Sequence, residues 1–429
     1  MNFRLRLFFT ILVYCSVAGV FSSMVMPGQE RNIRLGLFVC DGLMLSLAFL
    51  AFWRCRRFYG VWAFLAFLLA SILTFLYTSE RFGIFEHLNG LRDTLFFFTA
   101  LIVVYDLFHS EFRAAMTRRF TQFLIVFALV QIPLTIFQFI KSGAGDAVGG
   151  TFGSAGGSGY ITQLLFIICF FLAVRFASLE DGSHFSLKKL PFFLPVLLPC
   201  AINETKISFV LLGVFVVLVA GSRRRILRAL PLLVLGAGLA YLLNHFYTDT
   251  VEDTSNILDL DFVEKYLVTN ETDAGGDMPR FQRLVFMFNM MGNDVGSILL
   301  GMGYGILGGG NILGVSRLGR TLYYLVTGSR ILLFRAWIQG GLVAVVTMVF
   351  AMFSWMRSRV HQYPTLRKFH WFLAFSIFIV WVYNEAMLDR AFAMITTFLM
   401  IWTSEGGLVD EPVESQEGVT EEASQNAEA

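Results

Sequence analysis

Charged residues are scarce in this chain of 429 residues: they make up 15% of it, whereas soluble domains carry about 25%. Apolar residues reach 56%, and 47 of them are phenylalanine. Such a chain lacks the polar surface of a soluble protein and indicates a lipid-facing one. The formal net charge is only +2, so the basic residues do not form the footprint of a nucleic-acid-binding protein.

Cysteine and histidine are also few, with five and six residues. No cysteine falls in the one long hydrophilic loop, so no disulfide framework is predicted there. No Cys/His cluster has metal-ligand spacing, so no metal is expected. The first apolar run, 7–26, is long for a signal peptide, and no small-x-small cleavage site follows it. We therefore expect an uncleaved first membrane helix.

Apolar runs long enough to cross a bilayer follow one another along the chain. They predict an all-α, polytopic transmembrane helical bundle of about twelve helices. The two short runs near Asn203 are expected to form a hairpin, and the last two runs could also be one tilted helix. The twelve predicted spans are 7–26, 33–53, 61–77, 94–108, 121–140, 161–177, 190–202, 207–220, 230–247, 331–353, 370–383 and 389–402.

Arginine and lysine alternate in density from loop to loop. One set of loops, which includes the Arg54–Arg57 turn, holds 19 of them, and the opposite short loops hold 7. The positive-inside rule then predicts a bacterial inner-membrane protein with both termini in the cytoplasm. Residues 1–247 would form nine spans, 248–330 a long periplasmic loop, 331–402 three spans, and 403–429 a disordered acidic cytoplasmic tail.

The long loop contains one amphipathic pattern. Asp277 can cap a helix near 279–291, Pro279 suits its first turn, and Gly292 can end it. Phe281, Leu284, Phe288 and Met291 recur at helical spacing and predict the apolar face. Arg280 and Arg283 would lie three apart on another face. Two guanidiniums there suit a phosphate group, although snorkelling to lipid headgroups is an equally ordinary role for them.

The sequence offers four further motifs. Gly301-Met-Gly-Tyr-Gly305 superficially resembles a nucleotide loop, but without a strand–turn–helix frame it predicts a close backbone turn. Glu204 and Lys206 join two short spans and are either a simple charge pair or functional groups at membrane depth. Asp41, inside the second predicted span, is a weaker candidate of the same kind. We interpret Glu385, Asp389 and Arg390 as marking a turn.

Together these motifs resemble the O-antigen polymerase and ligase superfamily over roughly residues 120–402. The resemblance lies in the order of an Arg-led helix at 280–291, the Gly301–Gly305 turn, and Ser329-Arg-Ile-Leu-Leu-Phe-Arg-Ala-Trp-Ile-Gln-Gly-Gly-Leu342. Gly150-Thr-Phe-Gly153 is similar to the family's helix-opening motif. Asn203–Ser208 lies where relatives carry a Thr/Ser-Arg step, with Lys206 in place of arginine.

The resemblance implies a GT-C-like membrane glycosyltransferase that joins polyprenyl-diphosphate-linked repeat units into a surface polysaccharide. It implies a lipid bilayer, a lipid-linked glycan, a chain-length regulator and a flippase as partners, and no cofactor or nucleic acid. The implied catalytic residues are Arg280, Arg283, Lys206, Glu204 and Asp277, and the implied substrate-binding residues are Arg330, Arg335, Gly301, Gly303 and Tyr304.

Two rival functions remain open from the sequence. A ligase would transfer finished glycan, but relatives with that activity carry a histidine where this chain has Ser329 and Arg330, and none occurs between His245 and His361. A lipid-linked oligosaccharide flippase would show charges spread through its spans and an internal repeat. The sequence has few charges within its spans and no evident internal repeat.

Overall fold

The structure is a computed structural model of the chain, and it describes residues 3–25, 28–81, 83–143, 148–153, 157–181, 194–203, 207–220, 280–307, 309–310, 314–315, 331–356 and 364–405. Over these residues the fold is helical, apart from two short strands, β1 (Gly309–Gly310) and β2 (Gly314–Val315), which pair antiparallel. Seven of the described helices are long and apolar enough to cross a membrane. The all-helical membrane fold predicted from the sequence is therefore confirmed.

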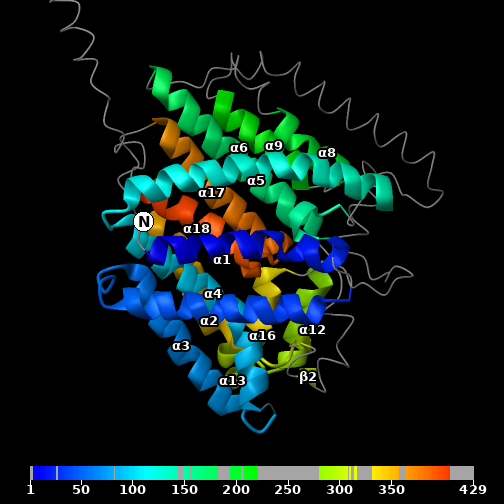
Figure 1. Cartoon of the computed structure of the whole chain (residues 1–429). Helices are drawn as coiled ribbons and strands as arrows, with labels where there is room; N and C mark the ends of the chain where they lie inside the picture. The colour runs from blue at the N-terminus through cyan, green and yellow to red at the C-terminus, as the bar shows by residue number, and fades with distance from the viewer. Residues whose placement is uncertain are drawn as a thin grey trace, which may run out of the picture.

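The long apolar runs form the long helices because each backbone polar group inside a bilayer must be satisfied within its own segment. Figure 1 labels most of them. The α-helices are α1 (Phe3–Val20), α2 (Glu30–Phe52), α3 (Tyr59–Thr78), α4 (Ile84–Phe108), α5 (Arg113–Ser142), α6 (Gly157–Asp181), α8 (Leu198–Ile202), α9 (Ile207–Ala220), α12 (Arg280–Met291), α13 (Val295–Leu300), α16 (Leu332–Phe353), α17 (Pro364–Tyr383) and α18 (Arg390–Ser404).

The bundle has an inner and an outer set of helices. Every residue from Ala391 to Thr403 in α18 is buried, and the apolar part of α6 is 89% buried, compared with 28% for α2. Figure 1 shows α1, α2 and α5 crossing the view in nearly the same direction, with α6 and α9 beyond α5 and α3 beyond α2. α18 packs most extensively on α4. Exposed apolar side chains on α2 and α3 therefore suit contact with lipid.

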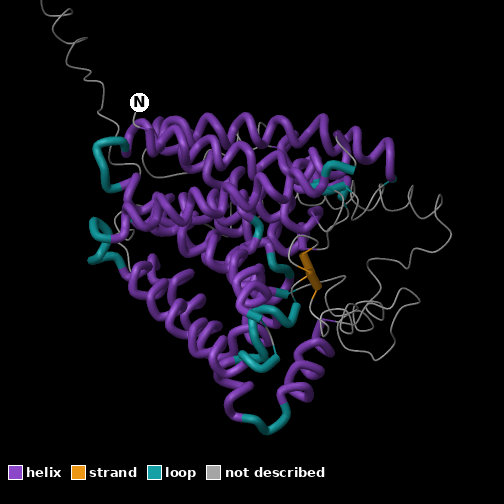
Figure 2. The backbone as a smooth tube through the Cα atoms, turned by 60° about the horizontal axis from the view of Figure 1, so that its bottom comes forward, coloured by secondary structure: helices purple, strands orange, loops and turns teal. Residues whose placement is uncertain are grey.

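Ten of the twelve predicted spans each coincide with one described α-helix. The span 190–202 is described only from Leu194, as a 3-10 turn followed by the short α8, and 230–247 lies outside the described residues, so the count of twelve stays a prediction. The structure adds two details about helix boundaries to the prediction from the sequence. α4 begins at Ile84, ten residues before the apolar run, and the last two spans are separate helices, with a break at residues 384–389. Figure 2 draws the described loops and turns between these helices in teal.

Residues 143–159 hold eight glycines, and two glutamines of α5 hold the described part of this glycine-rich segment. Gln138 donates from Nε2 to the Gly150 carbonyl at 2.8 Å and accepts from the Gly150 N–H at 2.7 Å. Gln131 likewise accepts from the Thr151 N–H at 3.0 Å. These amide pairs satisfy backbone groups that would otherwise be unpaired inside the bundle. The neighbours that this segment needs for order are therefore side chains of α5.

Candidate functional site

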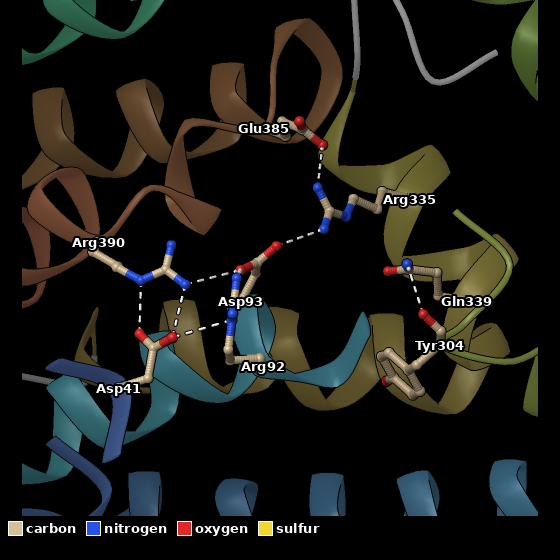
Figure 3. Close-up of polar contacts among 8 residues, drawn as sticks. All are labelled: Asp41, Arg92, Asp93, Tyr304, Arg335, Gln339, Glu385 and Arg390. Carbon is tan, nitrogen blue, oxygen red and sulfur yellow. Dashed lines mark hydrogen bonds and ion pairs between the residues drawn. The ribbon is translucent and has the colours of Figure 1, made fainter. Parts of the chain in front are cut away.

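Six charged residues meet in the middle of the bundle, and we call them the ion network: Asp41, Arg92, Asp93, Arg335, Glu385 and Arg390 (Figure 3). They come from α2, α4, α16, the turn before α18 and the first residue of α18. Three arginines face three carboxylates, so the formal charges of the six balance. All of them belong to the described part of the chain.

Asp41 holds one end of the ion network. Its Oδ1 accepts from Arg390 Nε at 2.6 Å, and its Oδ2 accepts from Arg390 Nη2 at 2.8 Å. Arg92 Nε lies 3.1 Å from the same Oδ2 atom. The Arg390 contact is a two-pronged guanidinium–carboxylate pair, which fixes orientation as well as charge. Asp41 thereby ties α2 to both α4 and α18.

Asp93 connects that end to the other. Its Oδ1 lies 3.2 Å from Arg390 Nη2, and its Oδ2 accepts from Arg335 Nη2 at 2.8 Å. Arg335 Nη1 then donates to Glu385 Oε2 at 3.0 Å. Figure 3 shows these contacts as one chain of ion pairs from Asp41 to Glu385. Arg335 is thus fixed from two sides by carboxylates of different elements.

The depth of the ion network makes it costly. Asp41 is the twelfth of 23 residues in α2, so roughly 16 Å of helix lies on either side of it. Charges at such depth are expensive to bury and are functional candidates by default. The Arg92 and Asp93 side chains keep 27% and 23% of their surface exposed. Because hydrocarbon cannot solvate these groups, their exposed parts require water or a polar ligand.

A broken helix lies beside the ion network. Gly341 interrupts α16 with φ +67°, which leaves the carbonyls before the break without their usual helical donors. The Met302 N–H donates to the Ile338 carbonyl at 2.8 Å, and the Gly303 N–H donates to the Gln339 carbonyl at 3.1 Å. The segment after α13 therefore replaces the missing helical hydrogen bonds, as polar backbone at membrane depth requires.

Gly301 and Gly303 allow this close approach. Both have positive φ, +76° and +104°, a region that favours glycine. A Cβ on Gly301 would lie 2.5 Å from the Gly341 N atom. Tyr304 follows, and its carbonyl accepts from Gln339 Nε2 at 3.3 Å (Figure 3). The predicted close backbone turn at 301–305 is therefore what the structure has, and its glycines serve the packing of two backbones.

Helix α12 spans Arg280–Met291, and Gly292 follows it with φ +59°, both as predicted. Its buried face differs from the predicted one. Phe288 is 46% exposed, whereas Arg283 and Met287 are completely buried. Met287 and Met291 pack against Phe334 and Ile338 of α16. Since Arg283 lies on the buried face, it does not extend to the lipid surface, and the snorkelling interpretation does not apply to it.

The remaining predicted site residues divide into two groups. Arg335 is in the ion network, and Tyr304 is buried beside α16, with a hydroxyl that has no hydrogen-bond partner among the described residues. Arg280 begins α12. Glu204, Lys206, Asp277 and Arg330 lie outside the described residues. Arg335 is thus part of α16, and Tyr304 lies beside that helix. Helix α12, which carries Arg283, also packs on α16.

Sequence reasoning missed most of the ion network. Arg92 and Asp93 precede the apolar run from which the fourth span was read, and Arg390 was interpreted as part of a turn. The turn at 384–389 exists, but it places Glu385 and Arg390 inside the bundle. One signal was available: Asp41 is an isolated carboxylate in the middle of an apolar run and requires a cation from another span. No family model and no curated protein sequence matches this chain.

Proposed function

We propose that this chain is a membrane glycosyltransferase that polymerises polyprenyl-diphosphate-linked oligosaccharide repeat units into a surface polysaccharide. The observation that carries the proposal is the arrangement around the first half of α16, before its break at Gly341. Arg335 is held there by Asp93 and Glu385, and α12, with the fully buried Arg283, packs on the same helix. The family resemblance at 280–291, 301–305 and 329–342 falls on these same elements.

The chemistry needs preorganised cations. A sugar hydroxyl of the acceptor attacks the anomeric carbon of the donor, the new glycosidic bond forms, and polyprenyl diphosphate leaves. Negative charge develops on the leaving phosphate, and fixed guanidiniums stabilise it in a site from which water is excluded. Arg335 Nε is buried and has no acceptor among the described residues. It is therefore a donor that a phosphate oxygen can use.

The hydroxyl proton requires a base. Asp93 and Glu385 already accept hydrogen bonds from arginine, so their oxygens are engaged in positioning. We assign the base to Glu204 or Asp277, as the sequence suggested, and the diphosphate to Arg280, Arg283, Lys206, Arg330 and Arg335. In this proposal both termini lie in the cytoplasm of a bacterial inner membrane, and 248–330 faces the periplasm.

Complementation tests the proposal. In cells that lack the gene, Arg335→Gln and Arg283→Gln should reduce polymerisation by roughly 100–1000-fold, as loss of one transition-state contact does. Arg34→Gln is the matched control, because Arg34 is exposed and, among the described residues, pairs with Glu30 one turn away. Polymer length is read on a gel beside a blot of the membrane protein. Wild-type chain lengths from both variants at normal abundance would contradict the assignment.

A lipid-linked oligosaccharide flippase is the second candidate, and one observation favours it. The ion network at mid-depth and the breaks at Gly341 and 384–389 are typical of transporters, whose sites lie at discontinuous helices. The same deletion strain separates the functions. Single repeat units on the surface glycan indicate a lost polymerase. Precursor that accumulates in the cytoplasm indicates a lost flippase, and unattached full-length polymer indicates a lost ligase.

A further inference from the structure

A second polar site lies at one end of the bundle, away from the ion network. A cavity of about 470 Å³ lies between the start of α1, the turn from α2 to α3, and the end of α4. Its charged lining consists of Arg4, Arg54, Asp106, His109 and Glu111. None of these residues has a part in the proposed reaction. We call this space the rim cavity.

Arg54 is preoriented at the rim cavity. Its Nε and Nη2 atoms each donate to a different oxygen of Asp106 at 2.7 Å, and this hydrogen bonding raises the pKa of Arg54. Nη1 makes no hydrogen bond to any residue in the described ranges. The Arg54 side chain is 44% exposed. The carboxylate therefore fixes the guanidinium plane, while one edge of the fork stays available to a ligand.

His109 adds a further cationic group, and its two ring nitrogens contact Tyr105 and Glu405. Burial lowers its pKa, but its hydrogen bonds to the Glu405 carboxylate and to the Tyr105 carbonyl outweigh burial and raise the pKa above its ordinary value. Arg56 and Arg57, both exposed, follow Arg54 in the same turn. In the cavity itself Arg4 and Arg54 balance Asp106 and Glu111, so the excess positive charge comes from this exposed turn. An anion is the ligand that this charge distribution attracts.

The surroundings point to an anion that carries acyl chains. α2 and α3 are candidate membrane spans, so the turn between them lies at the level of the lipid headgroups. Phe3 and Trp53, which precede Arg4 and Arg54 in the sequence, are both 73% exposed. Aromatic side chains at such a level contact the first part of the acyl chains. Basic pockets between membrane helices bind anionic lipid headgroups in this way.

We infer that the rim cavity binds the phosphate headgroup of an anionic phospholipid, with Arg54 and Arg4 as its cationic contacts and Asp106 as the internal competitor. Because Asp106 competes with the lipid, substitutions at Arg54 and Asp106 should change the affinity for the lipid in opposite directions. Arg54→Gln removes a contact and weakens binding. Asp106→Asn removes the carboxylate that engages Arg54 and that also lies 3.8 Å from Arg4 Nη1, and strengthens binding. A general loss of folding would instead weaken lipid binding by both variants.

The experiment uses the full-length protein in detergent, titrated with phosphatidylglycerol or phosphatidylcholine and observed by native mass spectrometry. Phosphatidylglycerol should bind more tightly than phosphatidylcholine. Removal of either arginine should weaken the binding of phosphatidylglycerol about fivefold. Asp106→Asn should make the binding tighter. Arg34→Gln, at the opposite end of α2, is the matched control and should change nothing. Inorganic phosphate and glycerol 3-phosphate are run as soluble competitors.

Three results would overturn the inference. Equal affinities for Arg54→Gln and Arg34→Gln would mean that the lipid is held by general contact around the bundle. Weaker binding to Asp106→Asn would mean that this carboxylate supports the site rather than competing for it. Displacement of the lipid by inorganic phosphate at the lipid's own concentration would identify a soluble anion as the ligand. Tighter binding to Asp106→Asn with weaker binding to Arg54→Gln is the outcome we expect.

Discussion

Two arginine–aspartate pairs in this protein have nearly the same geometry at very different depths. Arg390 grips Asp41 through Nε and Nη2 at 2.6 and 2.8 Å, and Arg54 grips Asp106 through the same atoms at 2.7 Å. The inner pair has 11% of each side chain exposed, whereas in the outer pair Asp106 has the same 11% but Arg54 has 44%. Depth, not geometry, therefore decides what each pair contributes, because solvent screens only the outer one.

The largest expected effect is at the inner pair. Arg390→Gln leaves Asp41 as a charge at membrane depth without its principal partner, and should destabilise the protein by about 3–5 kcal/mol. The double variant Asp41→Asn/Arg390→Gln should recover much of that loss, because no uncompensated carboxylate remains at that position. Thermal unfolding in one detergent measures both. A double variant as unstable as the sum of its single variants would show that the two residues do not act as a pair.

Backbone packing next to the ion network should be almost as sensitive. Gly341→Ala places a Cβ 2.2 Å from the Leu299 carbonyl oxygen at φ +67°, and should cost at least about 2 kcal/mol. Gly42→Ala is the contrasting change in α2, where a Cβ meets no atom within 4 Å. It should be neutral or stabilising by up to about 1 kcal/mol. Similar melting temperatures for the two variants would contradict the interlocked turn.

The outer pair should matter little for stability. Arg54→Gln should cost less than about 1 kcal/mol in the same unfolding assay, as expected of an exposed ion pair. High salt should weaken even that contribution, because mobile ions screen it. A loss comparable to that of Arg390→Gln would remove the distinction between the two depths.

The smallest expected effect depends on pH. Because the folded-state pKa of His109 is raised above its ordinary value of 6.5, its pairing with Glu405 contributes stability below about pH 6.5. That contribution disappears as the pH rises through the raised value. From below about pH 6.5 to alkaline pH, the wild type should therefore lose up to about 1 kcal/mol of stability relative to His109→Gln. Parallel pH profiles for the two proteins would contradict the pairing.

Hydropathy and helix-boundary residues were sufficient to predict most of the helices. α12 ends at the residue before Gly292, as predicted, and begins at Arg280, directly after Pro279, which lies outside the described residues. Hydropathy placed the start of α4 too late, because Arg92 and Asp93 read as a polar loop. Their partners are Asp41, Arg335, and Arg390, and Asp41 is 349 positions from Arg390. No local sequence pattern reveals pairs at that separation. From the sequence alone, a charged helical turn that is buried in such a network therefore looks the same as one that is exposed to solvent.

The sequence also did not predict which face of α12 is buried, for a related reason. The predicted apolar face was chosen by residue type, which assigned an arginine to the outside. In the structure Arg283 lies with Met287 on the buried side, where contacts within the fold outweigh the local preference of an arginine for solvent. The close turn at Gly301–Gly303 was predictable because glycine spacing reports backbone approach directly. Its partner, the break at Gly341, was not.

The most direct test of the central claim is reconstitution. Purified protein in liposomes receives polyprenyl-diphosphate-linked repeat units, and polymer length and released polyprenyl diphosphate are measured together. The wild type should release one polyprenyl diphosphate for each linkage formed. Arg335→Gln should lose both activities by roughly 100–1000-fold, while Arg34→Gln retains them. Lipid-linked units that cross the bilayer without forming any linkage would contradict the polymerase and establish the flippase instead.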